Sequence, residues 1–402
     1  MDRSRFSLFV GIGLINLTIV AMIGVIMRYK IGFEFPFLNQ KYLLHGHSHF
    51  AFAGWVTHIL YTLMVWFLGS NGIETKKYHL LIWANLLCAF GMLISFVAQG
   101  YGVVSITFST LSILVSYLIS YQYFKDLISL PKNLPSIPWF KAALFFNVLS
   151  SLGTFFLAYM MMTKTIQQNH YLGSVYFYLH FQYSGWFFFA MMGLLFSKMS
   201  QLETFKNDKV IFNTFFIACI PAYILSILWA KMPVYLYFLP IAAVLLQLYG
   251  LYKFSILLRS IIKELIQKWS FFVRMILGLS FLALIIKLLL QTGSLHPEIS
   301  KLAYGFRSIV IAYLHLVLLA ITTLFLLGFL VLTGYIKETK KVLVALTLFI
   351  VGVFANEFVL MVQGVASFGY ILIPYLNESL LAISLLMFFA MVMLSFYFHK
   401  RA

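Results

Sequence analysis

Charged residues are scarce in this chain of 402 residues. They make up 10% of it, while hydrophobic residues make up 62% and the mean hydropathy is +0.96. A water-soluble domain of this length needs far more surface charge, so the composition excludes one. The apolar runs are long enough for membrane-spanning helices rather than for barrel strands. We therefore expect an all-α integral membrane protein whose main partner is the lipid bilayer.

Acidic residues and cysteines are scarce as well. The chain has 11 Asp and Glu against 28 Lys and Arg, and its formal net charge is +17. The basic residues lie in short segments between apolar runs, which is typical of a polytopic membrane protein and argues against a nucleic-acid partner. The two cysteines, Cys88 and Cys219, both lie in apolar runs. A disulfide framework is therefore not expected.

Apolar runs of about 20 residues each predict twelve transmembrane helices. The first run has no small-residue cleavage site, so we expect it to be retained as a helix. All twelve fall in a single domain, 1–402. The runs lie near 6–27, 44–69, 78–100, 102–123, 139–163, 171–197, 210–230, 233–252, 269–291, 308–333, 342–366 and 370–398.

Basic residues in the connecting segments predict the orientation. With the N-terminus inside, 19 Lys and Arg fall on the cytoplasmic side and seven on the outer side. This imbalance follows the positive-inside rule, so both termini are predicted to be cytoplasmic. A bacterial inner membrane is the expected location.

The pattern His-Phe-x-x-x-Gly-Trp occurs twice, at 49–55 and at 180–186. His180 follows His49 by 131 residues, and His315 follows His180 by another 135. Each interval is close to a third of the chain, which predicts three pseudo-repeats, roughly 1–135, 136–268 and 269–402. An imidazole in the bilayer needs a hydrogen-bond partner or a metal. Three at a repeated spacing favour a metal or haem site, although an interhelical hydrogen bond is the alternative for each one.

Two more histidines precede the first copy of the pattern. His45 and His49 are four residues apart and share a helix face, while His47 points the other way. A histidine pair at this spacing can chelate one ion, which predicts copper or zinc near the rim of the bundle. The alternative is that His45 lies at the membrane interface without a metal. The glycine of the pattern is expected to let a neighbouring helix approach closely.

Polar residues in other apolar runs are further candidates. Tyr183 lies one turn after His180 and is expected to serve redox or proton transfer, or only to hydrogen-bond. Glu357 and Glu378 are expected to be buried, as proton relays or as partners of a cation such as Lys287.

Twelve helices with histidines on the second, sixth and tenth, near the outer face, resemble subunit I of the haem-copper oxidase superfamily, which includes nitric oxide reductases. The string Ala-Tyr-Leu-His-Leu-Val-Leu at 312–318 is similar to the Ala-His-Phe-His-Tyr-Val-Leu pattern on that family's tenth helix. The resemblance covers the whole chain in topology but only short strings in sequence. It implies three four-helix arcs and one haem b, with His315 and either His49 or His47 as axial ligands.

The chain also departs from the family pattern. Tyr313 stands where the active-site haem ligand lies in the family, and Ser184 occupies the place of a tyrosine after the copper-binding histidine. The seventh run contains no histidine pair. The resemblance thus implies a low-spin haem site with an incomplete haem–copper centre, in which His180 with His45 or His47 holds a second metal such as copper.

Three functions follow as hypotheses. The first is a haem-binding redox or gas-sensing membrane protein, with an electron-donor protein or quinol as partner and oxygen or nitric oxide as gas ligand. The second is an oxidoreductase, a terminal oxygen or nitric oxide reductase that uses His180, Tyr183 and Glu357. The third is a haem-free transporter whose histidines and carboxylates conduct protons or a metal.

Overall fold

The computed structural model describes residues 3–230 and 232–400. Nearly all of these residues are helical, and no strand occurs among them. The expected all-α architecture is therefore confirmed. The chain divides into two compact units, unit 1 (Met1–Asp126 with Leu326–Ala402) and unit 2 (Leu127–Phe325). The prediction of one domain in three pseudo-repeats stays a prediction.

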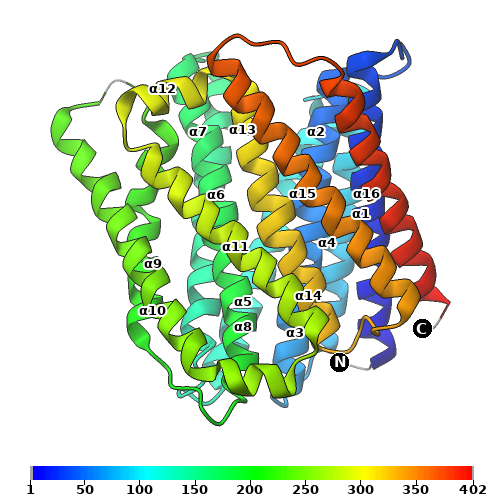
Figure 1. Cartoon of the computed structure of the whole chain (residues 1–402), viewed down its shortest axis with the longest axis vertical. Coiled ribbons are helices and arrows are strands. Elements are labelled where there is room, and N and C mark those ends of the chain that lie inside the picture. The colour runs from blue at the N-terminus through cyan, green and yellow to red at the C-terminus, as the bar shows by residue number, and fades with distance from the viewer. Residues whose placement is uncertain (1–2, 231, 401–402) are drawn as a thin grey trace. The chain divides into compact units, whose positions relative to one another are not determined.

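Unit 1 is built around its first and last helices. Helix α16 packs against both α15 and α1, and the three run side by side (Figure 1). The start of α1 and the end of α16 lie at the same end of the unit (Figure 1). The helices are α1 (Arg3–Gly32), α2 (Gln40–Phe50), η1 (Ala51–Thr57), α3 (His58–Ser70), α4 (Lys76–Gln99), α15 (Lys340–Phe368) and α16 (Leu376–His399), with most of α5 (Val103–Ser129) and α14 (Leu324–Leu332).

Unit 2 contains a helix that is bent in the middle. Its two parts, α9 (Lys209–Cys219) and η3 (Pro221–Ile227), meet at an angle of 44°. Proline has no N–H to donate, so the regular helix cannot pass through this position unchanged. The other helices are α6 (Ile137–Met162), α7 (Gln168–His180), η2 (Phe181–Phe187), α8 (Phe188–Met199), η4 (Val234–Tyr237), α10 (Phe238–Lys268), α11 (Phe271–Gly293), α12 (Pro297–Gly305), α13 (Arg307–His315) and η5 (Leu316–Thr323).

In the described part of the chain, ten helices are long and apolar enough to cross a membrane, or eleven if α9 and η3 form one span. This is the composition of a multi-pass membrane protein. The continuous helix Gln168–Met199 is not in this group. Its first half is rich in tyrosine, glutamine and histidine, which lowers its hydropathy. The predicted number of twelve spans is therefore not confirmed.

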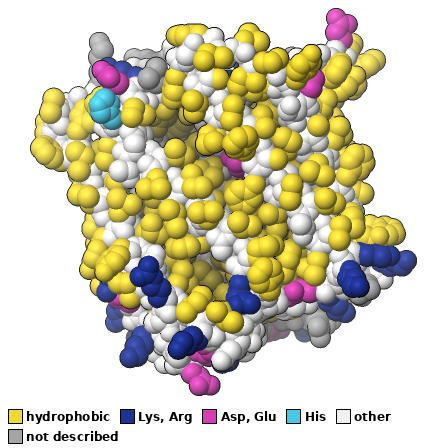
Figure 2. Space-filling view, in the orientation of Figure 1, with side chains coloured by type: hydrophobic (Ala, Val, Ile, Leu, Met, Phe, Trp, Pro, Cys, Tyr) yellow, Lys and Arg dark blue, Asp and Glu magenta, His cyan; other side chains and the backbone are white. Residues whose placement is uncertain are grey.

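Large apolar side chains are exposed along the outer faces of the helices. On α4, Leu80, Leu87 and Ile94 are 76%, 68% and 68% exposed, and their spacing of seven residues places them on one face. Hydrophobic side chains cover most of the surface drawn in Figure 2, while Lys and Arg gather near its lower rim. An apolar surface this large is a lipid-facing surface rather than a water-facing one.

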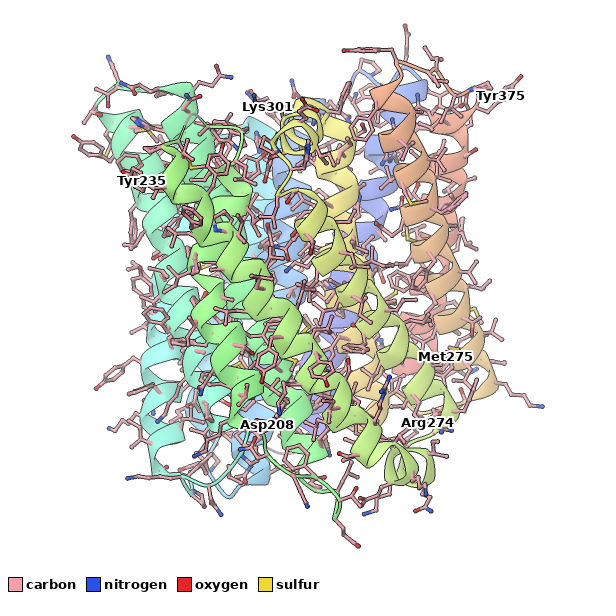
Figure 3. The ribbon with its side chains drawn as sticks, turned by 60° about the vertical axis from the view of Figure 1, so that its left-hand side comes forward. Asp208, Tyr235, Arg274, Met275, Lys301 and Tyr375 are labelled. Atoms are coloured by element: carbon pink, nitrogen blue, oxygen red, sulfur yellow. The ribbon has the colours of Figure 1, made fainter. Side chains whose placement is uncertain are left out.

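Polar residues mark the two ends of unit 2. Asp208 caps α9 by accepting a hydrogen bond from the amide of Val210, and it forms an ion pair with Lys253 at 2.8 Å. The hydrogen bond from Lys253 lowers the pKa of Asp208 below its ordinary value. Asp208 and Arg274 lie at one end of the unit, and Tyr235 and Lys301 lie at the other (Figure 3).

The exposed face of α4 gives a first prediction. Leu87→Lys should raise the free energy of inserting this helix by about 2–3.5 kcal/mol, because the ammonium cannot leave the middle of the bilayer. Leu80→Lys is the control, since Leu80 is close to Lys76 at the helix start and a lysine there can reach the interface. A glycosylation-based membrane-insertion assay measures both, and equal insertion of the two variants would contradict the lipid-facing assignment.

Candidate functional site

The histidines at the start of α2 lie as their spacing predicts. His45 and His49 share one face and pack on Tyr101 and Phe96, where the ring of His49 stacks on Phe96 at 4.2 Å. His47 lies on the other side, toward α1, where its imidazole hydrogen-bonds the backbone of Val20. His45 and His47 therefore point in different directions from one helix.

Several ring nitrogens in this part of unit 1 are buried without a hydrogen-bond partner. Among the described residues of unit 1, these are Nε2 of His45, Nδ1 of His47, Nδ1 of His58 and Nε2 of His79. Nε2 of His49 is already engaged with the hydroxyl of Tyr101 at 3.3 Å. A buried polar atom without a partner is costly, so it marks a place where a ligand would be stabilised. His45 and His47 each have a buried ring nitrogen free to bind a metal or haem, whereas Nε2 of His49 is already in contact with Tyr101.

His180 in unit 2 is almost fully buried, and one of its nitrogens is committed. Nε2 lies 2.8 Å from the carbonyl oxygen of Cys219. A carbonyl only accepts, so Nε2 must carry the proton. The bend at Pro221 explains why this carbonyl is available, because Tyr223 N–H bonds the carbonyl of Ile220 instead. Only Nδ1 of His180 is left to act as a ligand, which is the arrangement of a metal-binding histidine held by a backbone carbonyl.

Tyr183 is bound to neighbouring hydroxyl groups. Its side chain hydrogen-bonds Ser226 and Tyr313, and the two tyrosine rings lie 6.1 Å apart. The ring of His180 is 6.2 Å from that of Tyr183. The structure therefore brings the predicted site residues His180 and Tyr183 together, and Tyr313 lies beside them.

A buried cation lies next to the same segment. Lys287 is 6% exposed and donates to the hydroxyl of Ser184 at 3.1 Å. Among the described residues of unit 2, no carboxylate forms a salt bridge with it. The expected pairing with a glutamate such as Glu357, which belongs to unit 1, stays a prediction. Ser184, Cys219, Gln247 and Lys287 line a cavity of about 20 Å³, which has room for one water.

The remaining predicted residues are more dispersed. His315 ends α13 and is half-buried, and Glu357 on α15 accepts a hydrogen bond from Asn356 at 3.2 Å. Glu378 was expected to be buried, but it is exposed in the first turn of α16. This expectation was wrong because the last apolar run becomes helical only from Leu376, which leaves Glu378 at the helix end. Within residues 3–230 and 232–400, no three His, Cys, Asp or Glu side chains form a group that could hold a metal ion.

The structure adds a feature that the sequence pattern did not reveal. A π-helical segment follows each of the three repeated histidines, namely η1 after His49 and Phe50, η2 after His180, and η5 after His315. π-Helical turns are rare, and they are frequently found at functional sites. The two His-Phe-x-x-x-Gly-Trp copies fall on η1 and η2, so the repeated sequence corresponds to a repeated irregularity of the backbone.

Side chains on neighbouring helices bind the carbonyls of these segments. In η1, Asn16 donates to the carbonyl of Gly54 at 2.6 Å and Asn85 to that of Ala53 at 3.1 Å. In η5, Ser280 donates to the carbonyl of Ile321 at 2.7 Å. A change from α to π pairing displaces carbonyls from their usual partners, and no water in the bilayer core can replace them. These donors hold the π-helical segments in place.

The glycines of the repeated pattern differ in role. A side chain at Gly185 would come within 2.6 Å of Phe146 on α6, so this glycine does permit a close helix approach, as expected. At Gly54 the nearest obstacle is Phe50 of the same helix, at 2.7 Å. Gly54 therefore makes room for the phenylalanine of its own pattern, and Asn16 of α1 reaches its carbonyl at 2.6 Å. The expectation that Gly54 permits close packing by a neighbouring helix stays a prediction.

Removal of the donors to η1 gives a second prediction. Asn16→Leu should lower the free energy of unfolding by about 0.5–1.5 kcal/mol, because the carbonyl of Gly54 loses its partner in an apolar environment. Thr18→Val on the same helix is the control, since the Thr18 hydroxyl bonds the carbonyl of Leu14 and the hydroxyl of Ser395 rather than η1. Thermal unfolding in detergent micelles compares the two. A loss no larger in Asn16→Leu than in Thr18→Val would show that η1 does not depend on this bond.

Comparison with known proteins identifies no family for this chain. No protein-family model matches it, and no curated protein matches it either.

Proposed function

We propose that this chain is a haem-binding integral membrane protein with a redox or gas-sensing role, related to subunit I of the haem-copper oxidases. The observation that carries the proposal is the recurrence of a histidine followed by a π-helical segment in η1, η2 and η5. Unrelated structural histidines have no reason to share both a spacing in sequence and a local backbone irregularity. In this proposal the chain has twelve spans in three arcs, in a bacterial inner membrane with cytoplasmic termini.

His49 and His315 are the proposed axial ligands of a haem b, and His47 is the alternative to His49. The donor chemistry supports this assignment in part, because Nδ1 of His47 is buried without a partner, whereas Nε2 of His49 already contacts Tyr101. Haem, when bound, supplies reversible one-electron exchange, and its potential depends on ligand identity and burial. The chain's own contribution is to hold the imidazoles and to exclude water with apolar neighbours such as Phe96.

His180 is the proposed ligand of a second metal, with copper as the expected ion and His45 or His47 as further ligands. The hydrogen bond to the carbonyl of Cys219 fixes the tautomer of His180 and leaves Nδ1 as its ligand atom. Tyr183 and Tyr313 share a hydrogen bond beside it, which suits proton or electron transfer. If Glu357 also takes part in the reaction at this site, the protein is an oxygen or nitric oxide reductase. An electron-donor protein or quinol would be its partner.

The haem proposal makes a direct spectroscopic prediction. Purified protein should carry iron and an absorption spectrum of six-coordinate low-spin haem, and His315→Ala should abolish that spectrum. His296→Ala is a matched control in the same unit, because His296 lies at the N-terminus of α12 rather than within a long apolar helix. Absence of haem in the wild-type protein, or unchanged haem in His315→Ala, would refute the ligand assignment. Carbon monoxide then separates the haem roles, since a reductase or a gas sensor must bind it, and a bis-histidine haem that only exchanges electrons must not.

A second function is favoured by one specific observation, the buried lysine beside Ser184. An ionisable residue inside a membrane helix is a functional candidate by default. Lys287 faces a cavity with Cys219 and with Gln247, whose Oε1 has no hydrogen-bond partner among the described residues. A haem-free proton transporter would use such a lysine as a site where a proton is taken up and released.

Flux measurements test this second function. Lys287→Met should reduce proton flux into vesicles to the rate of protein-free vesicles, because methionine keeps the volume of the lysine stem and removes its proton-binding group. Lys198→Met, at the end of α8, is the control that removes a lysine near the membrane surface. Flux that persists in Lys287→Met would exclude a proton pathway through this side chain.

A further inference from the structure

Unit 2 contains a deep apolar groove that no candidate site uses. It has a volume of about 210 Å³ and lies between α8, α10, α11 and the helix η5–α14. Its floor is formed by buried side chains such as Met199, Phe254 and Phe325. Its rim includes Gly278, which is exposed, and Ile262, which is 46% exposed. The groove therefore opens on the apolar surface of the protein.

One end of the groove carries a positive charge without a counter-charge. Arg274 contributes to the lining, and its Nε donates a weak hydrogen bond of 3.4 Å to the carbonyl of Ser270. No carboxylate in the described part of the chain forms a salt bridge with it. The acid closest to the lining on α10, Glu264, is already bound by Lys268 at 2.6 Å and by Thr204. The guanidinium is thus available for an anion that the protein does not provide.

The position of Arg274 matches the polar boundary of a membrane. It lies in the first turn of α11, at the end of unit 2 where Asp208 also lies (Figure 3). Trp269, which precedes α11, also lines this end of the groove, and tryptophan is enriched at the headgroup level of membranes.

The length of the groove corresponds to one leaflet. On α11 the lining runs from Arg274 to Leu284. Ten residues of α-helix rise about 15 Å, which is half of the roughly 30 Å hydrocarbon core of a bilayer. A groove with a cation at the interface and apolar walls over this distance has the dimensions and polarity of one lipid acyl chain below a charged headgroup.

We propose that this groove is a binding site for one anionic phospholipid, with an acyl chain along α11 and its phosphate on Arg274. An arginine guanidinium can bind a phosphate through two hydrogen bonds. Its charge also favours a headgroup with a net negative charge over a neutral one. Phosphatidylglycerol is the expected occupant because its net negative charge complements the arginine. This inference does not depend on the haem proposal, because none of the candidate histidines lines the groove.

Lipid titration of the full-length protein, followed by native mass spectrometry, tests the site. Wild-type protein should bind one phosphatidylglycerol about fivefold or more tightly than phosphatidylcholine. Arg274→Gln should remove this preference while the acyl groove stays open. Gly278→Leu should block the site for both lipids, because an added Cβ there meets no atom within 4 Å and the longer side chain can enter the groove.

Gly293→Leu is the matched control. It lies on the same helix, its added Cβ also meets nothing within 4 Å, and it is outside the groove. Thermal unfolding checks the folding of each variant, and Ile262→Trp at the rim replaces Gly278→Leu if the latter does not fold. Equal affinity of the wild type for the two lipids would overturn the proposal, as would undiminished phosphatidylglycerol binding by a folded, groove-filled variant. An isoprenoid quinone in wild-type extracts that disappears in Gly278→Leu would overturn it too, because the occupant would then be a quinone.

Discussion

Backbone hydrogen bonding inside an apolar environment is the constraint on which this structure depends. Each peptide group in a membrane helix must find its partner within the protein, because the bilayer core supplies no water. Regular α-helix meets this demand, but among the described residues three helices contain π-helical segments and a fourth is bent at Pro221. The displaced carbonyls are bound by Asn16, Asn85, Ser280 and His180. These four buried polar side chains therefore have a structural role before any functional one.

This duty affects how the buried histidines are interpreted. Nε2 of His180 donates to the carbonyl of Cys219 at the bend, and Nε2 of His58 donates to the carbonyl of Phe9 at 2.8 Å. In both cases the bond uses Nε2 and fixes the tautomer, so the second nitrogen becomes the only ligand atom. A structural bond of this kind is compatible with metal binding, because histidine ligands usually donate their other ring nitrogen to a carbonyl or carboxylate. The bond from His180 to the carbonyl of Cys219 is therefore compatible with a purely structural role and with metal binding.

The surface of the protein follows from the same physics. Apolar residues such as Leu87 face outward, because lipid tails are as apolar as the side chains they contact. Some charged residues form local pairs, such as Asp208 with Lys253 and Glu264 with Lys268, while Lys287 and Glu357 lie within long helices. Arg274 is among the cations that form no salt bridge in the described part of the chain, and it stands at the mouth of an apolar groove. A cation left unpaired by the protein in such a place is explained by a lipid phosphate.

The sequence by itself determined the class of the protein, the approximate helices and the opposite directions of His45 and His47. These properties depend on composition, on run length and on the periodicity of one helix, which are local. The sequence did not reveal the π-helical segments. The same residues can form an α-turn or a π-turn, which differ by one residue in hydrogen-bond spacing, and side chains distant in sequence decide between the two. Asn16 and Asn85 could not be identified as donors to η1, because they are far from it in sequence. The exposure of Glu378, the contact of Lys287 with Ser184 and the groove beside Arg274 also required the tertiary structure. Each depends on which helices become neighbours, and packing between distant segments decides that.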